Sequence, residues 1–163
     1  MYEPRATLET RSLIAGLAAA PALVTELARE TPESNRKRRP APARWSVHEH
    51  ACHLAAVHPL FFERLDLMLT QRHPAIVPYD PPNAHQDGAL LDLDLDTELR
   101  RFTDDRARLV QRLSSLSTAD WGRSAEHPEY APYSIAIMFR HVLMHDMLHA
   151  YRMEELALKK DWS

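Results

Sequence analysis

Two histidines near the end of the chain, His145 and His149, have the spacing of paired metal ligands. Side chains four residues apart lie one above the other on the same face of an α-helix. This face also carries an apolar stripe, made of Ile135, Met138, Val142, Met153 and Leu156. A buried imidazole needs a partner for each ring nitrogen, and two imidazoles one turn apart suit a metal ion. The pair therefore predicts a metal centre on a core-facing helix.

A third histidine on the same segment, His141, cannot share one ion with His149. At a rise of about 1.5 Å per residue the two are about 12 Å apart along the helix axis. The pair on this helix is either His141 with His145 or His145 with His149. The apolar stripe favours the second pair, because His141 lies on its shoulder.

A further ligand should come from another helix, where His48, His50 and His53 are candidates. His48 projects to the polar side of the helical wheel, whereas His50 and His53 both flank the apolar face. Periodicity does not decide between these two. Three neutral imidazoles would leave one coordination position open, as in catalytic zinc sites, and they suit zinc, nickel, copper and iron alike.

Four helical segments are expected to position these residues: roughly 8–30, 46–72, 96–116 and 134–159. Ser46 and Glu49 have the spacing of a capping box, which indicates where the second helix begins. Pro59 should kink that helix and free the carbonyl of Ala55, and Pro21 should kink or split the first helix.

The connections between these segments are long and rich in proline. We interpret residues 31–44 as a solvated basic linker and 117–133 as a loop. Residues 73–90 are expected to wrap a site, with Tyr79, Asp80 and His85 as candidates for its rim. Residues 91–96 alternate in polarity but lack the residues of a calcium loop, so we expect a helix capped by Asp96 or Thr97. Four helices without a strand pattern predict an all-α four-helix bundle.

Composition narrows the classes of function. The 163 residues are 45% hydrophobic and 26% charged with a net charge of −3, which gives no electrostatic case for nucleic acid or a membrane surface. We expect no membrane span and no secretory leader. The single cysteine, Cys52, excludes an internal disulfide and is expected to serve packing in a cytoplasmic protein. Three glycines leave no phosphate-binding loop.

Two motifs in this order resemble those of a known family. Trp45-Ser46, Glu49 and His53-Leu54-Ala55 resemble the W-S-x-x-E-x-x-x-H-L-A signature of the DinB/YfiT-like metalloenzymes. His145-Asp146-x-x-His149 resembles the second signature of that family, H-D-x-x-H. The resemblance extends over nearly the whole chain.

The resemblance implies one DinB-like bundle domain over residues 1–163 with up-down-down-up topology. It implies a divalent metal ion, nickel or zinc, held by His53, His145 and His149. The choice of His53 over His50 comes from the resemblance alone. The family also implies a homodimer.

By the same resemblance, we expect a metal-dependent enzyme that transfers a low-molecular-weight thiol, such as bacillithiol or mycothiol, to a small-molecule substrate. The first alternative is a metal-dependent hydrolase that activates water with help from Glu49 or Asp146. The second is a non-catalytic binding module in which the metal staples helices together. The capping box already explains Glu49 without a role at the metal. Asp146 is either an acceptor that orients a metal ligand or the partner of an arginine.

Overall fold

The structure, a computed structural model, describes residues 4–80 and 87–162 as helices joined by long connections. Within these ranges there is no β-strand beyond three isolated bridges. The long elements are α1 (Pro4–Glu30), α3 (Val47–Ala56) continued by α4 (His58–Thr70), α6 (Leu95–Ser114) and α8 (Ile135–Ala157). Short helices are α2 (Glu33–Arg36), η1 (Ala89–Asp92) and α7 (Thr118–Trp121). The predicted all-α four-helix bundle is confirmed, with α7 lying in a segment expected to be loop.

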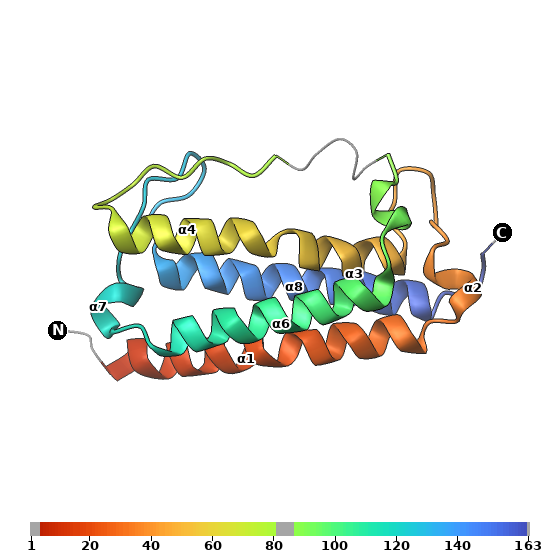
Figure 1. The fold of residues 1–163 in the computed structure, drawn as a ribbon, viewed down its shortest axis with the longest axis horizontal. Coiled ribbons are helices and arrows are strands. Elements are labelled where there is room, and N and C mark those ends of the chain that lie inside the picture. The colour runs from red at the N-terminus through yellow and green to blue at the C-terminus, as the bar shows by residue number, and fades with distance from the viewer. Residues whose placement is uncertain (1–3, 81–86, 163) are drawn as a thin grey trace.

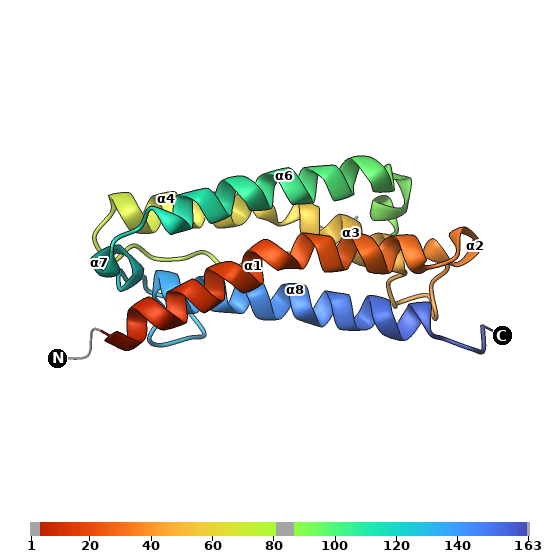
Figure 2. The ribbon, with the colours of Figure 1, turned by 90° about the horizontal axis from the view of Figure 1, so that it is seen from below.

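The four long elements run side by side, and their order gives the up-down-down-up topology (Figures 1 and 2). The α3–α4 pair and α6 run in one direction, while α1 and α8 run in the other. Residues 73–80 turn back along α4, which allows two consecutive bundle elements to run parallel. Helices α1 and α3 each pack against both α6 and α8, so α3 and α8 are neighbours across which a site can form.

Hydrogen-bonding caps define where the site-bearing helices begin. Ser46 and Glu49 form the predicted capping box at the start of α3, and Ser134 accepts from the backbone N–H of Ile137 at the start of α8. The expected cap of α6 is wrong: Asp94, and not Asp96 or Thr97, caps this helix by accepting from the Thr97 N–H. The 3-10 turn η1 occupies part of the alternating segment, and α6 begins at Leu95, one residue earlier than the expected start at residue 96.

The two internal prolines have different effects. Pro59 ends α3 and lies in the first turn of α4, which confirms the predicted interruption. Pro21 does not split α1, which continues through it. The carbonyl of Leu17, which loses its usual helical donor at Pro21, instead accepts from Arg106 Nη1 at 2.9 Å. A tertiary hydrogen bond therefore compensates for the proline inside the helix.

The apolar core consists of two clusters at the two ends of the bundle. The first includes Leu17, Met68, Leu109 and Val142, and the second includes Val24, Leu54, Phe102 and Ala150. Between Phe102 and Leu109 on α6 lies Arg106, and between Val142 and Ala150 on α8 lies Asp146; both are buried. A polar layer thus separates the two clusters near the histidines.

The basic segment 31–44 is largely exposed, as its composition indicated, but its cations are not free in solvent. Its Arg36, Lys37 and Arg38 side chains donate to the backbone carbonyls of Thr31, Leu91 and Trp162 respectively. Arg39 pairs with Glu49 through two nitrogens. These contacts hold the connection against the end of the bundle. The sequence pattern does not reveal them, because long side chains reach carbonyls in distant segments.

One expectation about membranes also needs correction. By length and mean hydropathy, residues 9–30 of α1 would suffice for a membrane span, with a mean hydropathy of 1.3. No apolar run of that length was expected from the sequence. In the bundle this helix packs against α6 and α8, and its buried face supplies core residues such as Leu17 and Val24.

Candidate metal centre

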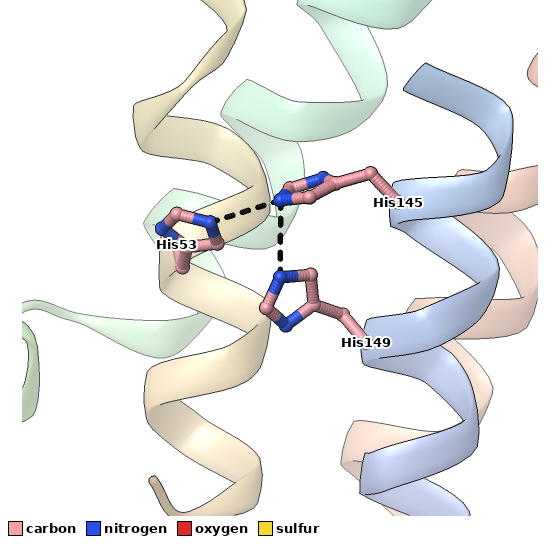
Figure 3. Close-up of side chains that lie close together, drawn as sticks. All are labelled: His53, His145 and His149. Carbon is pink, nitrogen blue, oxygen red and sulfur yellow. Dashed lines mark hydrogen bonds between the residues drawn. The ribbon is translucent and has the colours of Figure 1, made fainter. Parts of the chain in front are cut away.

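Three histidines from two helices converge between α3 and α8 (Figure 3). His53 projects from α3, and His145 and His149 project from successive turns of α8. His145 Nε2 lies 3.2 Å from His53 Nε2 and 3.1 Å from His149 Nε2. One ring nitrogen from each residue lies within 4.8 Å of the others. The structure therefore brings together the three residues that the family motifs indicated.

These separations fit ligands of a single metal ion. Nitrogens about 2.1 Å from one ion lie about 3.4 Å apart in a tetrahedral arrangement and about 3.0 Å apart at right angles. A ring nitrogen carries either one hydrogen or one lone pair, yet His145 Nε2 faces two other nitrogens. One cation at the centre would satisfy the lone pairs of all three nitrogens. Hydrogen bonds cannot do so, because His145 Nε2 would have to pair with two nitrogens at once.

The surroundings of His145 and His149 favour the neutral form of imidazole that binds metals. Burial, followed by the neighbouring His145, His53 and His50, lowers the pKa of His149 to about 2. Burial and Arg106 also lower the pKa of His145. Because metal binding requires an unprotonated nitrogen, this desolvation removes competition from protons at neutral pH.

His50, which the wheel left as an alternative ligand, contacts the cluster from outside. Its Nδ1 lies 2.8 Å from Nδ1 of His149, the ring nitrogen opposite the one that faces His145. When His149 Nε2 serves as a ligand, its Nδ1 carries the proton and can donate to His50. His50 is thus placed to orient a ligand. The resemblance to the family motif, not periodicity, separated it from His53.

Trp45 covers the same side of the cluster. Its ring centroid lies 4.8 Å from that of His53, 5.6 Å from that of His50 and 6.0 Å from that of His149, with the last pair stacked. These contacts place Trp45 at the histidines. An aromatic ring here excludes water from the imidazoles and fixes their planes.

Glu49 is held by groups other than the histidines. Its carboxylate accepts from Arg39 Nε at 2.9 Å, from Ser46 N at 2.9 Å and from Ser46 Oγ at 3.0 Å. Burial acts to raise the pKa of Glu49, but the hydrogen bonds from Arg39 and Ser46 outweigh it and lower the pKa. A carboxylate stabilised in this way is a weak base, and its contacts fix the start of the helix that carries His50 and His53.

Asp146 forms a buried ion pair next to a candidate ligand. Its Oδ2 lies 2.6 Å from Arg106 Nη1, and each side chain is 2% exposed. Burial raises the pKa of Asp146, and Arg106 opposes that shift. Arg106 Nε also donates to His58 Nε2 at 3.2 Å. Together with the Leu17 carbonyl, these contacts join α1, α4, α6 and α8 in the polar layer beside His145.

Other candidates from the sequence lie away from the cluster. His48 is buried and does not lie on a solvent-exposed face. Its Nε2 contacts the carbonyl of Leu90 in η1 at 3.0 Å, and a helical wheel of α3 cannot show this contact. The ring of His141 contacts Tyr130 and Tyr133. Cys52 is fully buried, and burial raises its pKa to about 12, in agreement with a packing role. His85 lies outside the described residues.

A cleft opens beside the cluster, between residues 40–45 and the last turns of α8. Its volume is about 870 Å³, within the range of small-molecule sites. Trp45 and His50, which both contact His149, form part of its lining. The candidate rim residues Tyr79 and Asp80 do not line it. The cleft gives a small molecule access to the neighbourhood of the histidines.

Comparisons with known proteins agree with this fold. The sequence profile of the DinB superfamily matches residues 17–153. A protein of Oceanobacillus iheyensis named "Putative metal-dependent hydrolase" is 30% identical over 120 residues, covering 72% of this chain and 68% of that protein. YfiT from Bacillus subtilis, described as a probable metal-dependent hydrolase with an unusual four-helix bundle topology, is 22% identical with a TM-score of 0.83. This likeness covers 94% of this chain and 89% of YfiT, and it shows a shared fold.

Proposed function

The chain belongs to the DinB superfamily, and we propose that it is a metal-dependent hydrolase whose divalent ion is held by His53, His145 and His149. The observation that carries the proposal is the convergence of three Nε2 atoms on one point between α3 and α8. Three protein ligands leave a coordination position open, as catalytic sites require. The name of the relative from Oceanobacillus iheyensis supports hydrolysis as the reaction class.

A divalent ion in such a site acts as a Lewis acid and lowers the pKa of water. The chain supplies the ligands and holds them. With an ion bound, His50 Nδ1 would accept a hydrogen bond from the Nδ1–H of His149, which would keep Nε2 of that ring unprotonated and available as a ligand. Trp45 excludes solvent from one side of the cluster.

The two carboxylates predicted to assist act, in this proposal, as positioning residues. Glu49 fixes the first turn of α3 through Ser46 and Arg39. Asp146 fixes α8 through Arg106. Both are thereby committed to hydrogen bonds with neighbouring cations, and their role is to hold His53 and His145 at the observed spacing.

The proposal is tested by hydrolysis assays on protein reconstituted separately with Zn²⁺ and Ni²⁺, using a panel of small ester and amide substrates. Turnover should require metal, should need no thiol, and should fall at least about 100-fold in H53A, H145A and H149A. H141A is the matched control, because it removes an imidazole from the same helix outside the cluster. Equal turnover in H149A and H141A would contradict the assignment.

A thiol S-transferase is the second candidate, favoured by the chemistry of the open position, which accepts a sulfur ligand as readily as an oxygen ligand. The thiol would come from solution, because burial keeps the Cys52 thiol protonated. Turnover of a model electrophile that appears only when bacillithiol or mycothiol is added would favour this reaction over hydrolysis.

Three further features belong to the proposal. We expect nickel or zinc as the ion, a homodimer in solution, and a cytoplasmic location. Elemental analysis and light scattering measure the first two, and fractionation of the source cells measures the third. If metal were bound without turnover of either substrate class, a stapling role would replace catalysis.

A further inference from the structure

The lining of the cleft beside the histidines carries positive charge. Arg44, Arg152 and Lys159 line it, together with two acidic residues, Asp87 and Glu155. Arg152 Nη1 pairs with Glu155 Oε2 at 2.7 Å, and within the described residues no other hydrogen bond or ion pair engages the Arg152 guanidinium. The three cations exceed the two acids by one charge, and a divalent ion behind His50 would add to the positive potential.

Arg44 differs from the other cations of its segment. The side chains of Arg36, Lys37, Arg38 and Arg39 all donate to backbone carbonyls or to Glu49. Within the described residues, the Arg44 side chain makes no hydrogen bond or ion pair. Arg44 is exposed and lines the cleft. A guanidinium in this position can form a two-point contact with a carboxylate or a phosphate group.

Other residues of the lining are apolar. The Trp45 ring, the prolines Pro40 and Pro42, and Leu156 of α8 provide apolar surface. His50, which also lines the cleft, contacts His149 at 2.8 Å. The lining thus combines cations, apolar surface and a residue in contact with a candidate metal ligand.

We propose that this cleft binds a small organic anion, with its carboxylate or phosphate group between Arg44 and Arg152 and its apolar part against Trp45. The proposal rests on the proposed function and adds the substrate class: the bond to be cleaved lies at the end of the molecule away from the anionic group. Lys159 contributes to the same attraction, and its ammonium also lies 5.8 Å from the centre of the Trp162 ring.

The test measures binding of two probes, inorganic phosphate and succinate, to the metal-free full chain by NMR titration at low ionic strength. We expect saturable binding of at least one probe, with shifts in the signals of Trp45 and His50. R44A and R152A should each weaken binding about tenfold, because each removes a charge-assisted hydrogen bond. R140A is the control, since Arg140 is an exposed arginine of the same helix outside the cleft lining.

Binding of phosphate alone would identify a phosphate-bearing substrate, and binding of succinate alone would identify a carboxylate. The absence of saturable binding for both probes would overturn the proposal. So would equal weakening by R44A, R152A and R140A, because that result reflects only the overall charge. The titration uses metal-free protein, so the two proposals can fail separately. A chain that binds the anion but takes up no metal would refute the hydrolase and leave the anion site. A chain that takes up metal but binds neither anion would refute the anion site alone.

Discussion

Replacing Asp146 by alanine should strongly destabilise the bundle, because it isolates a buried cation. Arg106 is 2% exposed, and its other partners are the Leu17 carbonyl and the His58 ring, neither of which is charged to balance it. Loss of one member of a buried pair costs about 3–5 kcal/mol. This is between about a fifth and the whole of the roughly 5–15 kcal/mol that stabilises a typical domain.

The double variant R106M/D146L should recover most of that loss, because it removes both charges and refills the space with apolar atoms. It leaves the Leu17 carbonyl without a donor, because Pro21 has no N–H to offer. Adding P21A supplies that N–H. We therefore expect P21A to stabilise the double variant by about 1–3 kcal/mol more than it stabilises the wild type.

Urea unfolding of these variants in the metal-free form measures the free energies of unfolding and their coupling. The reasoning is refuted if D146A costs less than about 1 kcal/mol, which would mean that water or another group compensates Arg106. It is also refuted if P21A has the same effect in both backgrounds, because the proline and the arginine would then be independent.

Two further predictions concern His50 and His58. H50A should weaken Zn²⁺ binding about 10–100-fold in a competition titration with a chromogenic chelator. H50Q should retain most of the affinity, because its amide oxygen can accept a hydrogen bond from His149. Equal affinities for wild type and H50A would exclude the orienting role. Burial and Arg106 lower the pKa of His58 from 6.5 to about 4, so the unfolded chain binds more protons below pH 6.5 and stability falls as the pH falls. Between pH 7 and pH 5 the His58 imidazole should remove about 2 kcal/mol from the free energy of unfolding. Urea unfolding at both pH values should show a smaller loss for H58Q than for the wild type. Identical losses in the two proteins would contradict the assignment.

The parts of this molecule that could be predicted from its sequence depend on neighbours along the chain. The capping box of Ser46 and Glu49 and the interruption at Pro59 are properties of a few adjacent residues. The pairing of His145 with His149 follows from helical periodicity in the same way. These local rules were sufficient for the four-helix bundle and two of the three converging histidines.

The remaining features depend on contacts between distant segments. The Leu90 carbonyl buries His48, which a helical wheel places on a polar face. Arg106 donates to the carbonyl that Pro21 leaves without a helical donor, and α1 continues where a kink or a split was expected. A helical wheel also cannot decide which of His50 and His53 is a ligand, because both flank the same face. Only the packing of α8 distinguishes them, since His53 faces His145 whereas His50 contacts the outer nitrogen of His149. Tertiary contacts therefore decide which polar residues form the site.

The central claim is that His53, His145 and His149 bind one divalent ion, and metal stoichiometry tests it most directly. The chain should be purified without a histidine tag, stripped with a chelator and titrated with Zn²⁺ and with Ni²⁺. Elemental analysis after removal of excess ion should give one ion per chain for the wild type and for H141A. Stoichiometric binding should be lost in H53A, H145A and H149A. A wild type that takes up neither ion, or three variants that all retain it, would contradict the claim.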